Sequence, residues 1–120
     1  MRVAVCGGRD FNDREAIWRG LDSVNDSEGR ITELAHGGCR GVDQIAAAWG
    51  ETEQIQVRLF AADWRKDGRA AGPIRNQRML DSFRPDVVIA FPGGRGTADM
   101  MRRARAAGVR IIEIPGAKDA

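Results

Sequence analysis

The chain has 120 residues and a formal net charge of +2, with 42% hydrophobic and 30% charged residues. This length predicts a single domain over residues 1–120 that buries about two-thirds of the surface of the unfolded chain, and so small a charge does not by itself indicate a nucleic-acid partner. Two cysteines and one histidine argue against a disulfide framework or a metal site, and no cofactor is expected. The lack of a long apolar stretch predicts a cytoplasmic protein with no membrane partner.

The first half of the chain predicts two strand-to-helix units. Residues 2–6 form a short apolar strand, and the turn-rich loop after it ends at Asp13, a good N-cap for a helix from about residue 14 to residue 24. A second strand is expected at residues 31–35. The glycine-rich loop after this strand leads to an alanine-rich helix over residues 42–52.

The next segment predicts an edge strand, a long loop and a helix. Residues 55–60 alternate polar and apolar side chains, which is typical of an edge strand. Residues 61–72 are then expected to form an unusually long loop, and such loops in compact domains are often functional. Pro73 fits the first position of the following helix. The apolar residues that we expect to pack in this helix are Ile74, Met79 and Leu80.

A buried strand is expected at residues 86–91, because this short run is apolar and β-branched. A helix follows at residues 98–107, closed by Gly108, and residues 109–114 supply a fifth strand before a frayed tail, 115–120. Strands and helices that alternate at these lengths predict an α/β fold: a three-layer, Rossmann-like parallel sheet with strand order 3-2-1-4-5 and helices on both faces. In such a sheet, ligands bind beside the loops after strands 1 and 4.

The loop after the fourth strand has the composition of a phosphate site. Gly93, Gly94 and Gly96 allow the backbone to approach a ligand closely. Thr97 is placed to cap the next helix, whose first free N–H groups attract an anion. A tight turn without a ligand would explain the same glycines. The ligand hypothesis gains weight because neighbouring loops are also rich in glycine, at Gly7, Gly8, Gly37 and Gly38.

Basic residues gather in one segment of the chain: Arg65, Lys66, Arg69, Arg75 and Arg78. Two interpretations compete. An arginine from this segment balances the charge of a phosphate held by the glycine loops, or the segment is a solvated face or a patch for a nucleic-acid backbone. Arg75 stands out because it lies near a helix start, next to Asn76.

Three acidic residues are candidates for catalysis: Asp10, Asp43 and Asp99. An enzyme that cleaves an N-glycosidic bond needs a carboxylate to activate water or to stabilise the transition state. Each aspartate also has a structural role open to it, in a turn or near a helix start. His36 is likewise either a base or a structural residue, and Trp64 and Phe11 either stack on a nucleobase or close the ends of the core.

These motifs together resemble the SLOG superfamily, in particular its small YspA-type, cpYpsA-related members, and they are similar to the LONELY GUY phosphoribohydrolases and the Rossmann-like domain of DprA. Residues 37–43, Gly-Gly-Cys-Arg-Gly-Val-Asp, are similar to the glycine loop of DprA. Residues 71–79, Ala-Gly-Pro-Ile-Arg-Asn-Gln-Arg-Met, resemble the YspA-type signature. Residues 92–97, Pro-Gly-Gly-Arg-Gly-Thr, match the phosphoribohydrolase motif, and the resemblance covers nearly the whole chain.

The resemblance implies a nucleotide ligand and leaves the activity open. In the phosphoribohydrolases, the glycine loop is followed by two residues and a catalytic glutamate, which together with an arginine cleaves nucleoside 5′-monophosphates. Here that position is Met100, whose thioether cannot activate water. The adjacent Asp99 is rotated by about 100° around the helix. The residues that hold phosphate are therefore kept, and the expected catalytic acid is not.

The sequence thus predicts a protein that binds a nucleotide or a nucleotide derivative, such as a phosphate-bearing or ADP-ribose-like ligand, and that senses or sequesters it. The residues expected to bind the ligand are Gly7, Gly8, Arg9, Asp10, Gly37, Gly38, Arg40, Asp43, Arg75, Asn76, Pro92, Gly93, Gly94, Arg95, Gly96 and Thr97. One alternative is a nucleoside 5′-monophosphate phosphoribohydrolase that uses Arg75 and one of the three aspartates. A second alternative is a DNA-binding module like DprA. The resemblance and the apolar faces of the later helices also allow a homodimer.

Overall fold

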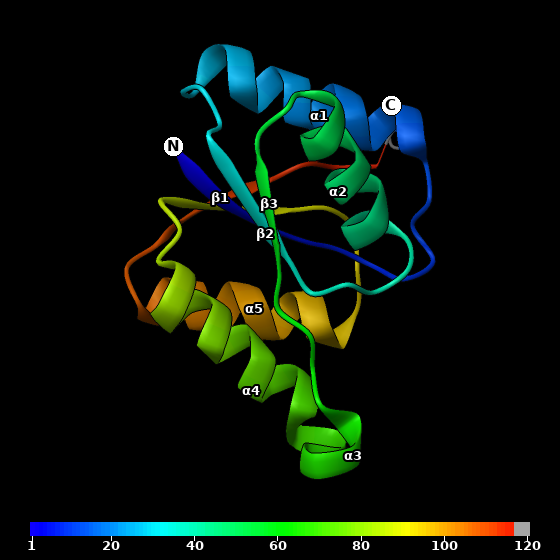
Figure 1. Ribbon diagram of the computed structural model, residues 1–120, viewed down its shortest axis with the longest axis vertical. Coiled ribbons are helices and arrows are strands. Elements are labelled where there is room, and N and C mark those ends of the chain that lie inside the picture. Colours follow the sequence, from blue (N-terminus) through cyan, green and yellow to red (C-terminus); the bar gives the residue numbers. More distant parts are fainter. Residues whose placement is uncertain (117–120) are drawn as a thin grey trace.

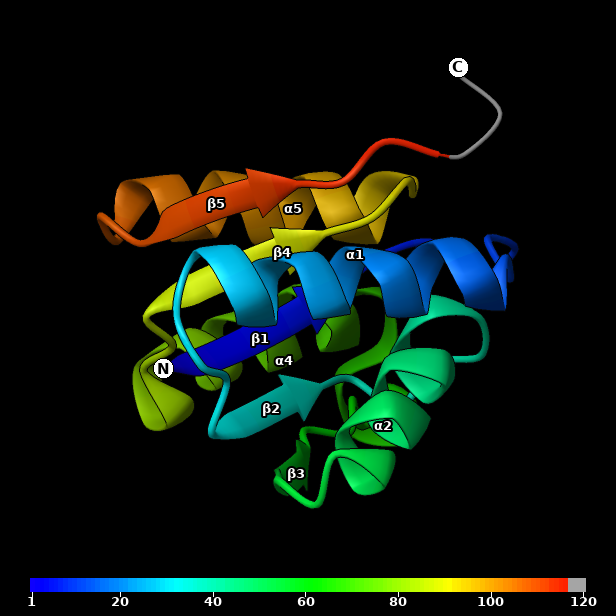
Figure 2. The same cartoon turned by 90° about the horizontal axis from the view of Figure 1, so that it is seen from above.

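The computed structural model describes residues 1–116 and contains a five-stranded sheet. The strands are β1 (Arg2–Cys6), β2 (Glu33–His36), β3 (Gln56–Leu59), β4 (Val87–Ala90) and β5 (Arg110–Glu113). Neighbouring strands are parallel, and their order is β3-β2-β1-β4-β5, which Figure 2 shows from β5 at the top to β3 at the bottom. The predicted Rossmann-like α/β fold and its strand order are therefore confirmed.

Helices cover both faces of this sheet (Figure 1). On one face lie α1 (Arg14–Ser27) and α2 (Val42–Thr52). On the other face lie α4 (Ala71–Arg78), which continues into the π-helical segment η2 (Met79–Phe83), and α5 (Arg95–Ala106). Within residues 1–116, none of the helices is both long enough and apolar enough to cross a membrane.

The sheet has one hydrophobic core on each face, between the strands and the helices. The central strands contribute to both cores because successive side chains point to opposite faces. In β1, Val3 and Val5 belong to the core under α1 and α2, whereas Ala4 belongs to the core under α4 and α5. The other central strand, β4, is buried along its whole length. Among the strands, those with exposed residues are β3 and β5, which form the two edges of the sheet. The centre of the sheet is thus a rigid base for the loops that follow β1 and β4.

Some element boundaries differ from those expected from the sequence. Instead of ending near residue 24, α1 runs to Ser27, and the amide of Glu28 still donates to the carbonyl of Val24 at 2.9 Å. The strand expected at residues 31–35 begins only at Glu33, because the amide of Ile31 donates to the Oδ1 atom of Asn25 at 2.7 Å instead of to a neighbouring strand. The tail expected at residues 115–120 lies largely outside the described residues.

The segment expected to be a long loop, residues 61–72, is mostly helical. It contains the short helix α3 (Trp64–Asp67), whose N-terminus is capped by Asp63, and a 3₁₀ turn, η1 (Gly68–Ala70). The carboxylate of Asp63 accepts a hydrogen bond from the amide of Lys66 at 3.1 Å. This cap stabilises a helix too short to show a periodic apolar pattern in the sequence.

The buried side of α4 is polar, contrary to expectation. Pro73 is the third residue of this helix rather than the first, a position whose N–H also has no partner in a helix. Ile74 was expected to pack and is instead 45% exposed. The buried positions next to it are occupied by Arg75 and Asn76. Two further residues pack as predicted, Met79 and Leu80.

Candidate functional site

Three loops meet at the carboxyl ends of the central strands. The amide of Gly8 donates to the carbonyl of Pro92 at 2.8 Å, which connects the loop after β1 to the loop after β4. The amide of Val42 donates to the carbonyl of Gly8 at 3.3 Å and so connects the start of α2 to the same loop. Together with α4, these loops surround a cavity of about 1140 Å³, called here the large cavity. It lies at the predicted switch point of the sheet and has room for a nucleotide.

Most of the residues expected to bind a ligand line the large cavity. They are Gly7, Gly8, Arg9, Asp10, Gly37, Asp43, Arg75, Asn76, Pro92, Gly93, Gly94, Arg95, Gly96 and Thr97. The other two, Gly38 and Arg40, line a neighbouring cavity of about 400 Å³, called here the small cavity. The two cavities share part of their lining, which includes Arg9, Trp64 and Arg75.

Packing inside the chain explains some of the glycines and not others. A Cβ atom at Gly93 would lie 2.1 Å from the Oγ1 atom of Thr97, so this position has no room for a side chain. At Gly94 and Gly96, in contrast, a Cβ atom would meet no atom of the described chain within 4 Å. Internal packing therefore does not require glycine at these two positions, whereas the close approach of a ligand would require it.

The first turn of α5 presents free N–H groups. This helix begins at Arg95 rather than at residue 98, so Thr97 lies inside its first turn and is not the N-cap. The N-cap is Gly94, which has no side chain to accept a hydrogen bond. The first helical bond runs from the amide of Ala98 to the carbonyl of Gly94 at 3.0 Å. The amides of Arg95, Gly96 and Thr97 consequently have no partner in the helix, and they form a site suited to an anion.

Arg75 contributes a buried positive charge to the lining of the large cavity. The residue is 9% exposed. Its Nη1 atom donates to the carbonyl of Gly37 at 2.9 Å, and its Nε atom donates to the Oδ1 atom of Asn76 at 2.9 Å. No carboxylate among residues 1–116 forms an ion pair with it. The carboxylate of Asp43 lies close enough to interact with this charge, but it forms no direct ion pair with it. A buried guanidinium without a directly paired carboxylate is costly, and an anion in the cavity would balance it.

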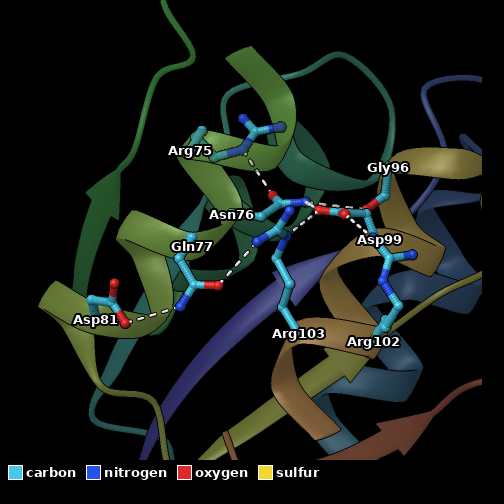
Figure 3. A network of polar contacts seen from close by, with 8 residues as sticks. All are labelled: Arg75, Asn76, Gln77, Asp81, Gly96, Asp99, Arg102 and Arg103. Carbon is cyan, nitrogen blue, oxygen red and sulfur yellow. Dashed lines mark hydrogen bonds and ion pairs between the residues drawn. The ribbon is translucent and has the colours of Figure 1, made fainter. Parts of the chain in front are cut away.

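Asn76 connects Arg75 to the first turn of α5 (Figure 3). Its Oδ1 atom accepts the hydrogen bond from Arg75, and its Nδ2 atom donates to Asp99 Oδ2 at 3.0 Å and to the carbonyl of Gly96 at 3.3 Å. One amide group thus fixes the guanidinium relative to the free N–H groups of α5. The sequence placed Asn76 beside Arg75 but did not show this connection.

Asp99 is an ionised anchor within this network. Its carboxylate pairs with Arg102 and Arg103. Neither arginine was among the residues expected from the sequence, although residues three and four positions after an aspartate on a helix are placed to pair with it. Burial opposes ionisation of Asp99, but the hydrogen bond from Asn76 and the pairs with Arg103 and Arg102 outweigh it and lower the pKa. Met100, at the position of the glutamate that the resemblance implies, is 1% exposed and belongs to the core under α4 and α5.

Asp43 is a second buried carboxylate of the cavity. Its Oδ2 atom accepts hydrogen bonds from the amides of Gly37 and Cys39, both at 3.2 Å. Burial raises the pKa of Asp43, although these two bonds and the nearby Arg75 oppose the shift. A cavity carboxyl group with a raised pKa suits proton transfer better than one that is fully paired.

Asp10 and His36 have surroundings that favour structural roles. Asp10 is exposed and pairs with Arg40 at 2.9 Å. The Nδ1 atom of His36 accepts a hydrogen bond from the amide of Gly38 at 3.0 Å, and burial lowers the pKa of His36. His36 is therefore neutral, and it belongs to the lining of neither cavity described above.

The aromatic and basic residues noted in the sequence occupy different surroundings. Phe11 packs against the core under α1 and α2 and also lines the large cavity, whereas Trp64 is 50% exposed and lines both cavities. Arg69 lines the large cavity, but Arg78 donates to the carbonyl of Ala61 at 2.7 Å. Since Arg75 is buried, the basic residues of this segment do not form one continuous face.

The chain resembles a known family, a phage protein and a solved structure. The model of the YspA, cpYpsA-related SLOG family matches residues 1–66. The Gene 61 protein of Mycobacterium phage D29 is 39% identical in an alignment 121 residues long. The alignment covers 94% of this chain and 95% of that protein. The X-ray structure of TM1055 has a TM-score of 0.67 and 17% identity, over 92% of this chain and 71% of that one. At this identity, the likeness to TM1055 shows the fold alone.

Proposed function

Because the chain belongs to the YspA, cpYpsA-related SLOG family, we propose that it binds a nucleotide or a nucleotide derivative through a phosphate or ribose phosphate. The observation that carries the proposal is the buried guanidinium of Arg75, which has no ion pair in the described part of the chain and lines the same cavity as the uncapped first turn of α5. A bound phosphate is stabilised by a cation that balances its charge and by N–H groups that donate hydrogen bonds to its oxygens.

In the proposed complex, the phosphate accepts hydrogen bonds from the amides of Arg95, Gly96 and Thr97. Arg75 balances its charge, in a position fixed by Gly37 and Asn76. Open space at the glycines of the loop lets the phosphate approach the backbone. With methionine where the related phosphoribohydrolases have a glutamate, such a protein retains its ligand, and we propose that it senses or sequesters a nucleotide signal.

Titration calorimetry with AMP, ADP-ribose and ribose 5-phosphate tests this proposal. The wild-type protein should bind at least one of these ligands. Arg75→Ala should weaken that binding by roughly tenfold or more, since a hydrogen bond to a charged group is typically worth about 1.5–3 kcal/mol.

Two further variants make the result interpretable. Arg105→Ala removes the same charge from an exposed position of α5 outside both cavity linings, and it should leave the affinity unchanged. Arg75→Lys fills more of the buried space than alanine and keeps the charge, but it loses the planar fork, so its affinity should be intermediate. Wild-type affinity in a folded Arg75→Ala protein would contradict the site assignment.

A second candidate function is hydrolysis of nucleoside 5′-monophosphates to free base and ribose 5-phosphate. The observation in its favour is Asp43, a buried carboxyl group of the cavity with a raised pKa. As a general base, Asp43 would take a proton from the water that attacks C1′ of the ribose, while the bond from C1′ to the base breaks and its electron pair leaves with the base. The departing base then takes up the proton from Asp43, so that neutral base and ribose 5-phosphate are released. A proton NMR time course with AMP tests this function. Free adenine that appears with the wild type and not with Asp43→Asn would support hydrolysis.

A further inference from the structure

An exposed tryptophan lies beside the proposed phosphate site. Trp64 is 50% exposed and lines both the large and the small cavity. Unlike Phe11, which packs against one of them, Trp64 is neither part of the hydrophobic cores found in residues 1–116 nor among the half-buried side chains that pack against them. The large cavity, at about 1140 Å³, also exceeds what a phosphate alone would fill. An aromatic side chain open to solvent at a cavity is a surface suited to a flat apolar group.

The position of this side chain is set by the elements around it. Trp64 is the first residue of α3, the helix that Asp63 caps. A Cβ atom at Gly72 would lie 3.5 Å from the Cη2 atom of Trp64, so the edge of the indole ring lies next to the backbone of α4. The ring is thus located by the fold, and it does not depend on the packing of a core.

Arg9 lies over the ring from the loop after β1. Its Cζ atom is 5.9 Å from the centre of the Trp64 ring, and it too lines both cavities. In the described chain, Arg9 forms no ion pair that would fix it. Because a flat ring needs about 3.5 Å on each side for van der Waals contact, a small outward movement of the Arg9 side chain would admit one between the two groups.

We propose that Arg9 and Trp64 bind the base of the nucleotide whose phosphate is held by Arg75 and α5. The inference rests on the proposed function, and it adds the chemical class of the second ligand group: a planar heteroaromatic base. The base stacks on the indole ring, and the guanidinium of Arg9 stacks on the other side of the base. Arg75 lines both cavities, so the phosphate site and the base site are contiguous.

Calorimetry with AMP and with ribose 5-phosphate separates the two sites, because the second probe has the phosphate and lacks the base. Trp64→Ala should weaken AMP binding by roughly tenfold, a typical loss for one stacked base, and leave the affinity for ribose 5-phosphate unchanged. Trp64→Phe keeps an aromatic ring and should retain most of the AMP affinity. Equal losses for both probes, or no loss for either, would overturn the inference.

Tryptophan fluorescence gives an independent measurement. AMP stacked on Trp64 should quench the emission, and the quenching should disappear in Trp64→Phe. It should persist in the control Trp18→Phe, because the indole of Trp18 lies on α1 and donates to the carbonyl of Ile45. If ribose 5-phosphate binds and Trp64→Ala leaves AMP affinity unchanged, the base site alone is wrong. If the wild type binds neither probe and does not bind ADP-ribose, the proposed function and this inference fail together.

Discussion

The guanidinium of Arg75 occupies the space that a side chain at Gly37 would need. A Cβ atom at residue 37 would lie 2.1 Å from the Nη1 atom of Arg75. The same Nη1 atom donates to the carbonyl of Gly37 at 2.9 Å, so the loop after β2 both makes room for the arginine and orients it. The glycine of this loop therefore acts on the cavity indirectly, through the arginine that it accommodates.

Gly37→Ala should weaken phosphate binding and leave the protein folded. The new methyl group meets the end of a flexible side chain, which can move aside, and the guanidinium then leaves its position in the cavity. We expect roughly tenfold weaker binding of ribose 5-phosphate by calorimetry, of the order of one lost hydrogen bond to a charged group. Thermal melting of the same samples should show only a modest decrease in Tm.

Gly50→Ala is a matched control for this substitution. A Cβ atom there would lie 2.7 Å from the Cγ2 atom of Val57, which is a similar degree of crowding at a position outside both cavity linings. It should change the stability without changing the affinity. If Gly37→Ala binds ribose 5-phosphate as well as the wild type does, the position of Arg75 is not important for binding.

Gly96→Ala should change stability and binding in opposite directions. Since a Cβ atom at Gly96 would meet no described atom within 4 Å, the substitution costs no packing, and alanine favours the helix by up to about 1 kcal/mol. The same methyl group would project into the space that the phosphate needs. Urea unfolding should therefore show an equal or higher stability, and calorimetry a lower affinity. If glycine is required at this position for packing instead, Gly96→Ala should lower the stability and leave the affinity unchanged.

The arrangement of the sheet was predictable from the sequence because it depends on patterns that are local and repeated. Each strand is a short apolar run, and each connection is long enough for a helix, which together imply a parallel sheet. The short helix α3 was not predictable in this way. It depends on a single cap, Asp63, and on Gly68, whose φ of 56° ends the helix. A run of four residues is too short for a periodic pattern to reveal it.

The sequence indicated the glycine loops of the cavity and the residues Asp43, Arg75 and Asn76 in its lining, but not the contacts that hold these side chains in place. These loops follow strands 1, 2 and 4 in the sequence, and parallel strands place such loops at one edge. The burial of Asn76 depends instead on Asp99 and the carbonyl of Gly96, and that of Arg75 on the carbonyl of Gly37, all of which are distant in the sequence. In α4, the polar residues Arg75 and Asn76 are therefore buried, whereas the apolar Ile74 is exposed.

Asp99→Asn should destabilise the protein at neutral pH, by about 2 kcal/mol, because Arg102 and Arg103 lose their charged partner. The folded pKa of Asp99 lies below its ordinary value of 3.8. Its stabilising effect is consequently complete above that value and is lost as the pH falls through the folded pKa. Urea unfolding should show a constant difference from the wild type at neutral pH and a shrinking one at acidic pH. Asp81→Asn, an exposed position of the same network, should have little effect at any pH.

Asp43→Asn should show the opposite pH dependence. Burial raises the folded pKa of Asp43 above its ordinary value of 3.8, so the folded protein binds the proton more tightly than the unfolded chain does. The stability gained from this proton is complete below 3.8 and is lost as the pH rises through the folded pKa.

The amide of asparagine still offers an oxygen to the amides of Gly37 and Cys39, and it carries no charge. The variant should therefore be more stable than the wild type at neutral pH, and this advantage should vanish at acidic pH. A wild type that is the more stable protein at neutral pH would mean that attraction to Arg75 outweighs burial, and that the pKa of Asp43 is lowered instead.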